Sequence, residues 1–89
     1  MISTRITITN KLGLHARASA KLTKLAGGFP CDVFLSRGAR RVNAKSIMGV
    51  MMLAAGLGAE IEIETSGERE QEAMEALRAL IEARFGEGE

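Results

Sequence analysis

Strict alternation of polar and apolar residues marks two segments of the chain as β-strands. In residues 2–9 every second residue is Ile or Thr, and residues 59–65 alternate glutamate with isoleucine. A period of two is typical of a strand with one buried and one wet face. Two shorter runs, residues 31–35 and 40–44, flank a hairpin-type turn and predict two further strands in the middle of the chain.

Apolar residues at helical spacing predict three helices. The first covers residues 16–26, the second runs from Ser46 to the glycines at 56 and 58, and the third opens at residues 66–70 with Ser66 as its N-cap. Their expected apolar stripes are Ala18, Leu22, Leu25 and Ala26 in the first, Ile47, Val50 and Met51 in the second, and Met74, Leu77, Ile81 and Phe85 in the third.

The predicted elements follow the order β-α-β-β-α-β-α, which is an α+β arrangement. Four strands with three helices on one face satisfy layer packing, and the clean alternation over residues 59–65 leaves the other face of the sheet open to water. We expect one domain over residues 1–89, with 86–89 as a frayed tail. The pattern alone leaves the strand order open, because a ferredoxin-like order and other split arrangements both fit.

Composition and charge narrow the class of protein. A single cysteine, Cys31, rules out an intrachain disulfide and is expected to be a small core residue. We see no signal peptide and no run of about 20 apolar residues, so we expect a cytoplasmic protein with no membrane insertion. Residues 1–45 carry a net charge of +8 and residues 46–89 carry −7. This asymmetry predicts one basic and one acidic face, or simply two solvated faces that attract each other weakly.

The sole histidine, His15, is the residue on which most chemistry could depend. A zinc site needs about three protein ligands, and the chain offers no second His. It has no GxxxxGK[ST] loop for nucleotides, and a Ser/His/Asp triad would have to use Asp32, the only Asp, without a nucleophile elbow. These absences disfavour metal, nucleotide and hydrolase chemistry.

What remains is the imidazole itself as a nucleophile. Neutral imidazole is available near pH 7 and forms covalent intermediates. His15 lies where the first helix begins, and the unpaired N–H groups of a first helical turn attract an anion such as a phosphoryl group. Arg17 adds a permanent charge with planar donors. The alternative is that His15 is only a surface residue that caps the helix.

Two motifs give these features a family resemblance. The stretch GLHARASAKLTKLA at residues 13–26, followed by NAKSIMGVMMLAAGLG at residues 43–58, resembles HPr, the histidine-containing phosphocarrier family of the bacterial phosphoenolpyruvate-dependent phosphotransferase system. The resemblance covers about residues 2–85 and includes the element order. One departure is Ala18, where many members carry proline, a residue suited to the first turn of a helix.

The resemblance implies a fold and a function. The fold would be an open-faced β-sandwich, a four-stranded antiparallel sheet in the order 1-4-2-3 covered on one face by three helices. His15 would accept a phosphoryl group from enzyme I on Nδ1 and pass it to an enzyme IIA acceptor, while Arg17 and the amides of Ala16 and Arg17 stabilise it. The protein would be a transiently phosphorylated carrier rather than an enzyme, and it would need no cofactor.

The resemblance also implies a regulatory site and a partner surface. Ser46 would be phosphorylated by an HPr kinase/phosphorylase, or it is a helix N-cap and nothing more. By family match the partner surface comprises Ala16, Ala20, Lys24, Lys45, Ile47, Met48 and Met51, with Met48 the methionine expected to be exposed. The alternative is that the methionines of this set fill the core and that its lysines are simply solvated.

Three other interpretations compete with the sugar-transport carrier. A nucleic-acid-binding domain would use the basic half, but the chain has no Trp or Tyr and only three Phe. A relative that has lost phosphotransfer would be expected to lack His15. A nitrogen-related phosphocarrier with a regulatory acceptor fits the same residues, and the sequence does not separate it from the sugar branch. We expect a monomer, because a carrier alternates between partners.

Overall fold

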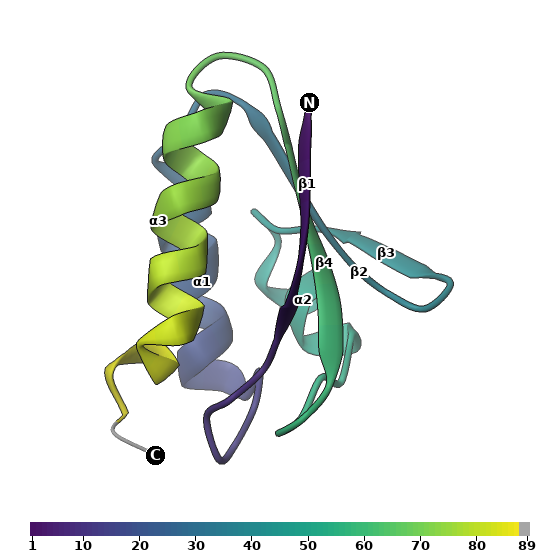
Figure 1. Cartoon of the computed structure of the whole chain (residues 1–89). Helices are drawn as coiled ribbons and strands as arrows, with labels where there is room; N and C mark the ends of the chain where they lie inside the picture. The colour runs from purple at the N-terminus through teal and green to yellow at the C-terminus, as the bar shows by residue number, and fades with distance from the viewer. Residues whose placement is uncertain (88–89) are drawn as a thin grey trace.

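The computed structural model of the chain describes residues 1–87. Its elements follow the predicted order (Figure 1), with one short 3-10 turn added at the end. They are β1 (Ile2–Thr7), α1 (Ala16–Gly27), β2 (Asp32–Arg37), β3 (Arg40–Asn43), α2 (Ile47–Met52), β4 (Glu60–Ser66), α3 (Glu70–Glu82) and η1 (Arg84–Gly86).

The four strands form one antiparallel sheet in the order β1-β4-β2-β3. This order confirms the arrangement that the family resemblance implies and settles what the pattern left open. The last strand of the chain lies in the middle of the sheet, where Ile61 pairs with Ile6 and Ile63 pairs with Leu35. The strictly alternating strand β4 therefore has a neighbour on each side, as does β2.

The core lies between one face of the sheet and the helices. Ile61 and Ile63 are buried, while the three glutamates that alternate with them point to the opposite face, as the alternation predicts. Helices α1 and α3 lie side by side over the buried face (Figure 1) and bring Leu22 and Leu77 into the core. Helix α2 packs against α1 and β3 at the side of this layer.

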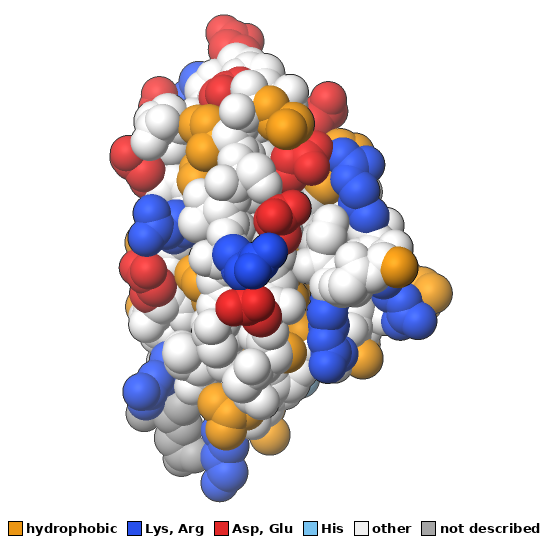
Figure 2. Space-filling view, turned by 45° about the vertical axis from the view of Figure 1, so that its right-hand side comes forward, with side chains coloured by type: hydrophobic (Ala, Val, Ile, Leu, Met, Phe, Trp, Pro, Cys, Tyr) orange, Lys and Arg blue, Asp and Glu red, His pale blue; other side chains and the backbone are white. Residues whose placement is uncertain are grey.

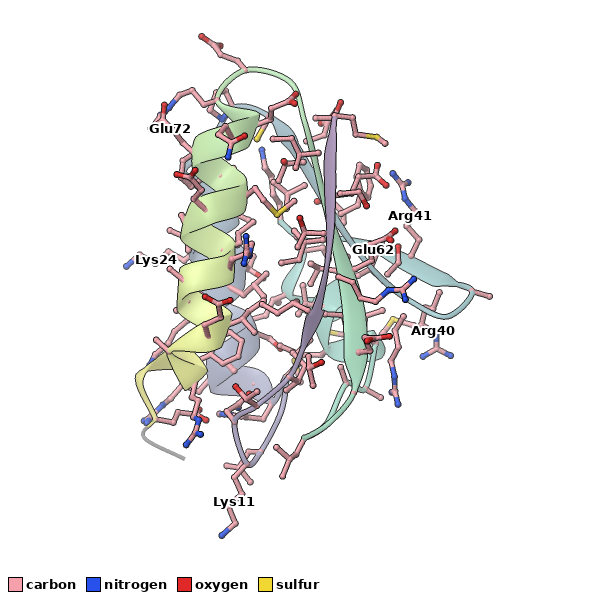
Figure 3. The ribbon with its side chains drawn as sticks, in the orientation of Figure 1. Lys11, Lys24, Arg40, Arg41, Glu62 and Glu72 are labelled. Atoms are coloured by element: carbon pink, nitrogen blue, oxygen red, sulfur yellow. The ribbon has the colours of Figure 1, made fainter. Side chains whose placement is uncertain are left out.

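The two charged halves of the chain mix on the surface instead of forming separate faces. On the open face of the sheet, Arg41 donates to Glu64 at 2.7 Å and Arg5 lies 3.7 Å from Glu60. Figure 3 shows Arg41 and Glu62 together on the side away from α1 and α3, and Figure 2 shows both signs of charge on one face of the molecule. The expected division into a basic and an acidic face is therefore wrong, because β4 is inserted between two strands from the basic half.

Helix α3 begins later than predicted, and Ser66 does not cap it. Ser66 ends β4, and Arg69 occupies the N-cap position in left-handed backbone without a side-chain cap. The carboxylate of Glu70 instead holds the turn before the helix: it accepts from the Gly67 amide at 2.9 Å and lies 3.0 Å from the amino group of Met1. The Gly67 hydrogen bond is the main reason that the pKa of Glu70 is lowered.

The C-terminal turn is folded onto the body of the protein. The last helix ends at Glu82, and Phe85 enters the core from η1 with a φ of 55°, although the spacing placed it on the helix stripe. Its side chain is 1% exposed. Lys21 of α1 donates to the Phe85 carbonyl at 2.6 Å, and Glu87 contacts the N-terminal half of the chain. The expected frayed tail over 86–89 is wrong at residues 86 and 87, while residues 88 and 89 lie outside the described part.

Replacing Phe85 with alanine tests whether this turn belongs to the core. We expect Phe85→Ala to lower the free energy of unfolding by about 3–5 kcal/mol, because it leaves a cavity under η1. Leu57→Ala is the control, since Leu57 is 63% exposed and its removal should change the stability by less than about 0.5 kcal/mol. Denaturant unfolding measures both, and equal losses would show that the turn contributes nothing to the core.

Candidate functional site

The loop before α1 is fixed by main-chain contacts that only a glycine allows. Gly13 has a φ of +65°, and a Cβ there would lie 2.4 Å from the carbonyl oxygen of Ala55. The next amide, that of Leu14, donates to the same oxygen at 2.9 Å. The side-chain amide of Asn10 donates to the Gly13 carbonyl at 2.8 Å. The residue before His15 is therefore tied directly to the loop that follows α2.

His15 occupies the N-cap position of α1, but its side chain does not cap the helix. Its backbone is extended, with φ −73° and ψ 178°, and the first helical bond runs from the Ser19 amide to the His15 carbonyl at 2.8 Å. The buried Ser19 hydroxyl donates to the Leu14 carbonyl at 3.0 Å and secures the same turn. The interpretation of His15 as a capping residue is thus correct for its position and wrong for its imidazole.

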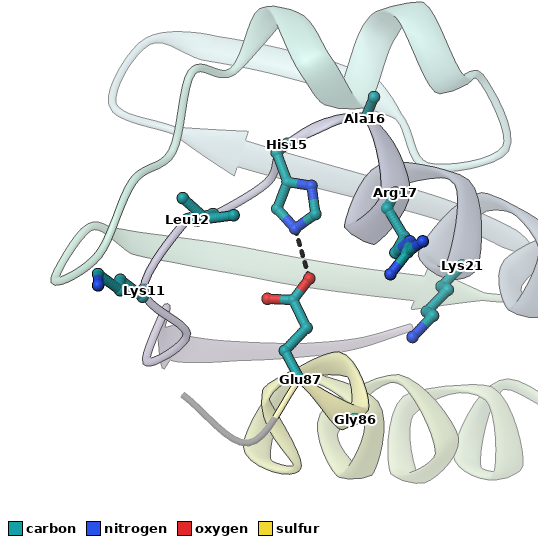
Figure 4. Close-up of a pocket in the computed structure, with 8 residues that line it drawn as sticks. All are labelled: Lys11, Leu12, His15, Ala16, Arg17, Lys21, Gly86 and Glu87. Atoms are coloured by element: carbon teal, nitrogen blue, oxygen red, sulfur yellow. Dashed lines mark hydrogen bonds and ion pairs between the residues drawn. The ribbon is translucent and has the colours of Figure 1, made fainter.

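The two ring nitrogens of His15 have different surroundings. Nε2 is hydrogen bonded to the carboxylate of Glu87, while Nδ1 lies on the side of the ring that faces Ala16 and Arg17 (Figure 4). The imidazole is about a quarter exposed. The other Glu87 oxygen accepts from the Asn10 amide at 3.0 Å, and this bond is the largest cause of the lowered pKa of Glu87, to which the His15 bond adds. Within residues 1–87, Nδ1 is therefore the ring nitrogen left open to a reactant.

An open hollow collects positive charge around the imidazole. Arg17 and two lysines share it with His15, and the amides of Ala16 and Arg17 have no acceptor inside the helix because they belong to its first turn. Such a helix start attracts an anion. Among residues 1–87 no three His, Cys, Asp or Glu side chains gather where they could hold a metal. The lining residues are Lys11, Leu12, His15, Ala16, Arg17, Lys21, Gly86 and Glu87.

Glu87 is the acidic residue of this site, and sequence reasoning missed it, as it also missed Lys11 and Lys21. It lies 72 positions from His15, in the segment expected to be frayed. The apolar Phe85 was the one signal that could have pointed to it, because a buried anchor two residues away holds the chain against the body.

Ser46 caps α2 as predicted. Its hydroxyl accepts from the Gly49 amide at 3.2 Å, and the residue is exposed. The hydroxyl therefore has a structural role and is also accessible from solvent.

Helix α2 turns most of its apolar side chains outward. Val50 is buried, but Ile47 and Met51 are each 40% exposed, so the expectation that all three face the core is wrong. The helix has six residues and packs mainly against the side of α1 and β3, and Val50 is its one buried side chain. Met48, at 67%, is exposed as expected, and so is Met52, at 60%, which sequence reasoning missed.

All seven residues predicted for the partner surface are exposed on α1, on α2 or just before α2. We call this set, Ala16, Ala20, Lys24, Lys45, Ile47, Met48 and Met51, the α1–α2 surface. The two helices that carry most of the set pack against each other. Lys45 also donates to the Phe29 carbonyl at 2.8 Å, which holds its side chain beside the end of α1.

Comparisons with known proteins identify the family to which this chain is related. A family model described as "PTS HPr component phosphorylation site" matches residues 2–83. The phosphocarrier protein HPr of Cupriavidus necator is 66% identical to this chain over 89 residues, and the alignment covers 100% of both chains. The crystal structure of HPr-C-His from Thermoanaerobacter tengcongensis superposes with a TM-score of 0.95 at 41% identity, over 98% of each chain.

The chain belongs to the HPr family. Members are phosphocarriers of the phosphotransferase system and not catalysts. Phosphocarrier protein NPr of Shewanella violacea is more distant, at 40% identity over 93% of this chain and 91% of its own. The similarity therefore favours the HPr branch over the nitrogen-related one. In the described part of the chain, no helix has the length and apolar character needed to cross a membrane.

A pair of glycine substitutions tests the loop that presents His15. Gly13→Ala and Gly38→Ala both place a side chain at a positive φ, of +65° and +60°, but only Gly13 has backbone atoms within 4 Å of the added Cβ. We expect Gly38→Ala to cost about 1 kcal/mol of unfolding free energy. The added clash should make Gly13→Ala cost at least about 1 kcal/mol more and shift the amide signals of Leu14 and Ala55. Equal costs with unshifted signals would show that the close approach is not a constraint.

Proposed function

We propose that this chain carries a phosphoryl group on Nδ1 of His15, received from enzyme I and passed to an enzyme IIA acceptor. The observation that carries the proposal is the orientation of the ring, which keeps Nε2 against Glu87 and turns Nδ1 toward the first turn of α1. Phosphoryl transfer depends mainly on positioning and on stabilising the charge of the transferring group. The amides of Ala16 and Arg17 and the Arg17 guanidinium supply that stabilisation.

The placement of charges suits a carrier that keeps its cargo. The carboxylate of Glu87 lies at Nε2, on the other side of the ring from the proposed phosphoryl group. It is therefore poorly placed to activate a water molecule against a phosphoryl group on Nδ1. The neighbours of that position are N–H groups and cations, which hold the phosphoryl oxygens without attacking phosphorus.

The α1–α2 surface is the proposed docking site for both partners. Its centre is apolar and includes Ile47, Met48 and Met51, while Lys24 and Lys45 add positive charge at its margin. Such an arrangement fits a partner with an acidic rim and an apolar centre. Because one surface serves donor and acceptor in turn, we propose that the carrier works as a cytoplasmic monomer.

Ser46 is the proposed regulatory site, modified by an HPr kinase/phosphorylase. The hydroxyl is exposed and lies next to Lys45 and Ile47 of the α1–α2 surface. A phosphate there would keep an acceptor for the Gly49 amide and add negative charge to the docking site. It would weaken binding to an acidic partner. The alternative function of Ser46, helix capping alone, rests on the same hydrogen bond.

Phosphorylation with enzyme I and phosphoenolpyruvate tests the carrier function. We expect one phosphate per wild-type chain that is lost on brief acid treatment, and none in His15→Ala, because phosphohistidine is acid-labile and phosphoserine is not. Arg17→Ala should slow phosphorylation by about a hundredfold through loss of one charged donor. Intact mass measures both. An acid-stable phosphate, or an acid-labile one in His15→Ala, would contradict the proposal.

Replacing Met48 tests the docking surface separately. We expect Met48→Ala to raise the Kd for enzyme I about tenfold while leaving the melting temperature unchanged, because the side chain is exposed in the free protein. Met74→Ala is the matched control: this methionine is 2% exposed, and its loss should lower stability by about 2–5 kcal/mol without weakening docking of the folded protein. If Met48→Ala loses as much stability as Met74→Ala, then Met48 is a core residue and not part of a docking surface.

A further inference from the structure

A chain of hydrogen bonds links the C-terminal turn to the reactive ring. Asn10 Nδ2 donates to one oxygen of Glu87 at 3.0 Å, and the other oxygen of Glu87 is paired with Nε2 of His15. Asn10 is completely buried and also holds the Gly13 carbonyl. Of the described residues that line the hollow, Glu87 alone carries a carboxylate. This carboxylate is therefore placed by a buried amide and aimed at the nitrogen that the proposed transfer does not use.

We propose that Glu87 is a positioning residue for phosphoryl transfer, keeping the proton of His15 on Nε2 and stabilising the positive ring that forms when Nδ1 is phosphorylated. This inference rests on the proposed carrier function. The physical basis is general: a carboxylate that accepts from one imidazole N–H fixes the tautomer and stabilises the imidazolium.

The charge balance of the step shows why a carboxylate helps. The lone pair of Nδ1 forms the bond to phosphorus, and the bond from phosphorus to the donor atom breaks with its electron pair going to the donor. Nε2 keeps its proton, so the ring gains one positive charge directly against Glu87. When the acceptor attacks phosphorus, the N–P electron pair returns to Nδ1 and the ring charge disappears. No other reactant is needed in either direction.

The fold holds Glu87 in place through the turn that precedes it. Phe85 is buried, and Gly86 has a φ of +76°, which turns the chain back toward the loop of His15. Lys21 donates to the Phe85 carbonyl. The charged groups that face the imidazole are then Glu87 at Nε2 and Arg17, Lys11 and Lys21 around the rest of the hollow. The one anion thus lies where the ring becomes positive, and the Arg17 guanidinium lies on the other side of the ring, toward the phosphoryl oxygens on Nδ1.

The tautomer of His15 is the first test, and it needs no phosphoryl donor. Nitrogen-15 shifts of the imidazole, read through its carbon-bound protons above pH 8, give the fraction of protons on each nitrogen. We expect the wild type to hold the proton on Nε2 and Glu87→Ala to show a measurable fraction on Nδ1. Glu75→Gln, on the exposed side of α3, should match the wild type. A proton on Nδ1 in the wild type, or the same distribution in Glu87→Ala, would overturn the proposal.

The second test separates the charge of Glu87 from its geometry. Glu87→Gln keeps an acceptor of similar shape but removes the charge, so we expect kcat for phosphorylation by enzyme I to fall about tenfold with KM unchanged. A purely structural role would leave kcat unchanged, and an inhibitory carboxylate would raise it; either result overturns the proposal. If the proposed carrier function itself is wrong, the wild type takes up no phosphate from enzyme I. The tautomer measurement needs no phosphoryl donor, so it still tests whether Glu87 fixes the proton on Nε2.

Discussion

The close approach of Gly13 to the Ala55 carbonyl is the constraint on which the rest of the site depends. It leaves no room for a Cβ and lets the Leu14 amide bond to the same oxygen, so the residue before His15 has one allowed place. His15 then becomes the N-cap of α1, with the free amides of the first turn beside Nδ1. The same contact joins this loop to the segment that follows α2, which connects the ring proposed to carry the phosphoryl group to the helix proposed for docking through the main chain.

Much of this arrangement could be predicted because it is encoded locally. The alternation over residues 59–65 gave the central strand its buried and wet faces, and the spacing of Ala18, Leu22 and Ala26 gave the buried side of α1. His15 at a helix start beside Arg17 is likewise a feature of neighbouring residues. The strand order was different: periodicity assigns faces and not neighbours, so the order came from the family resemblance and needed the structure to confirm it.

What could not be predicted depends on contacts between distant residues. Glu87 reaches His15 only because Phe85 is buried and the turn around Gly86 brings the chain back. Outward apolar side chains on α2 escape a stripe analysis, because a six-residue helix at the side of the core buries little of its surface. The two charged halves mix because the acidic strand β4 pairs with β1 and β2, a consequence of topology that net charge does not reveal. These three features therefore depend on tertiary contacts and topology, which local sequence patterns do not encode.

Phosphorus NMR of the phosphorylated protein, combined with amide shifts, tests the central claim most directly. The claim is that the loop presents Nδ1, and not Nε2, to the first turn of α1. The expected result is a phosphoryl signal typical of Nδ1-phosphohistidine, with the largest amide shifts at Ala16 and Arg17 and little change in β1 and β4. A phosphoryl group on Nε2, or largest shifts away from the start of α1, would contradict the account.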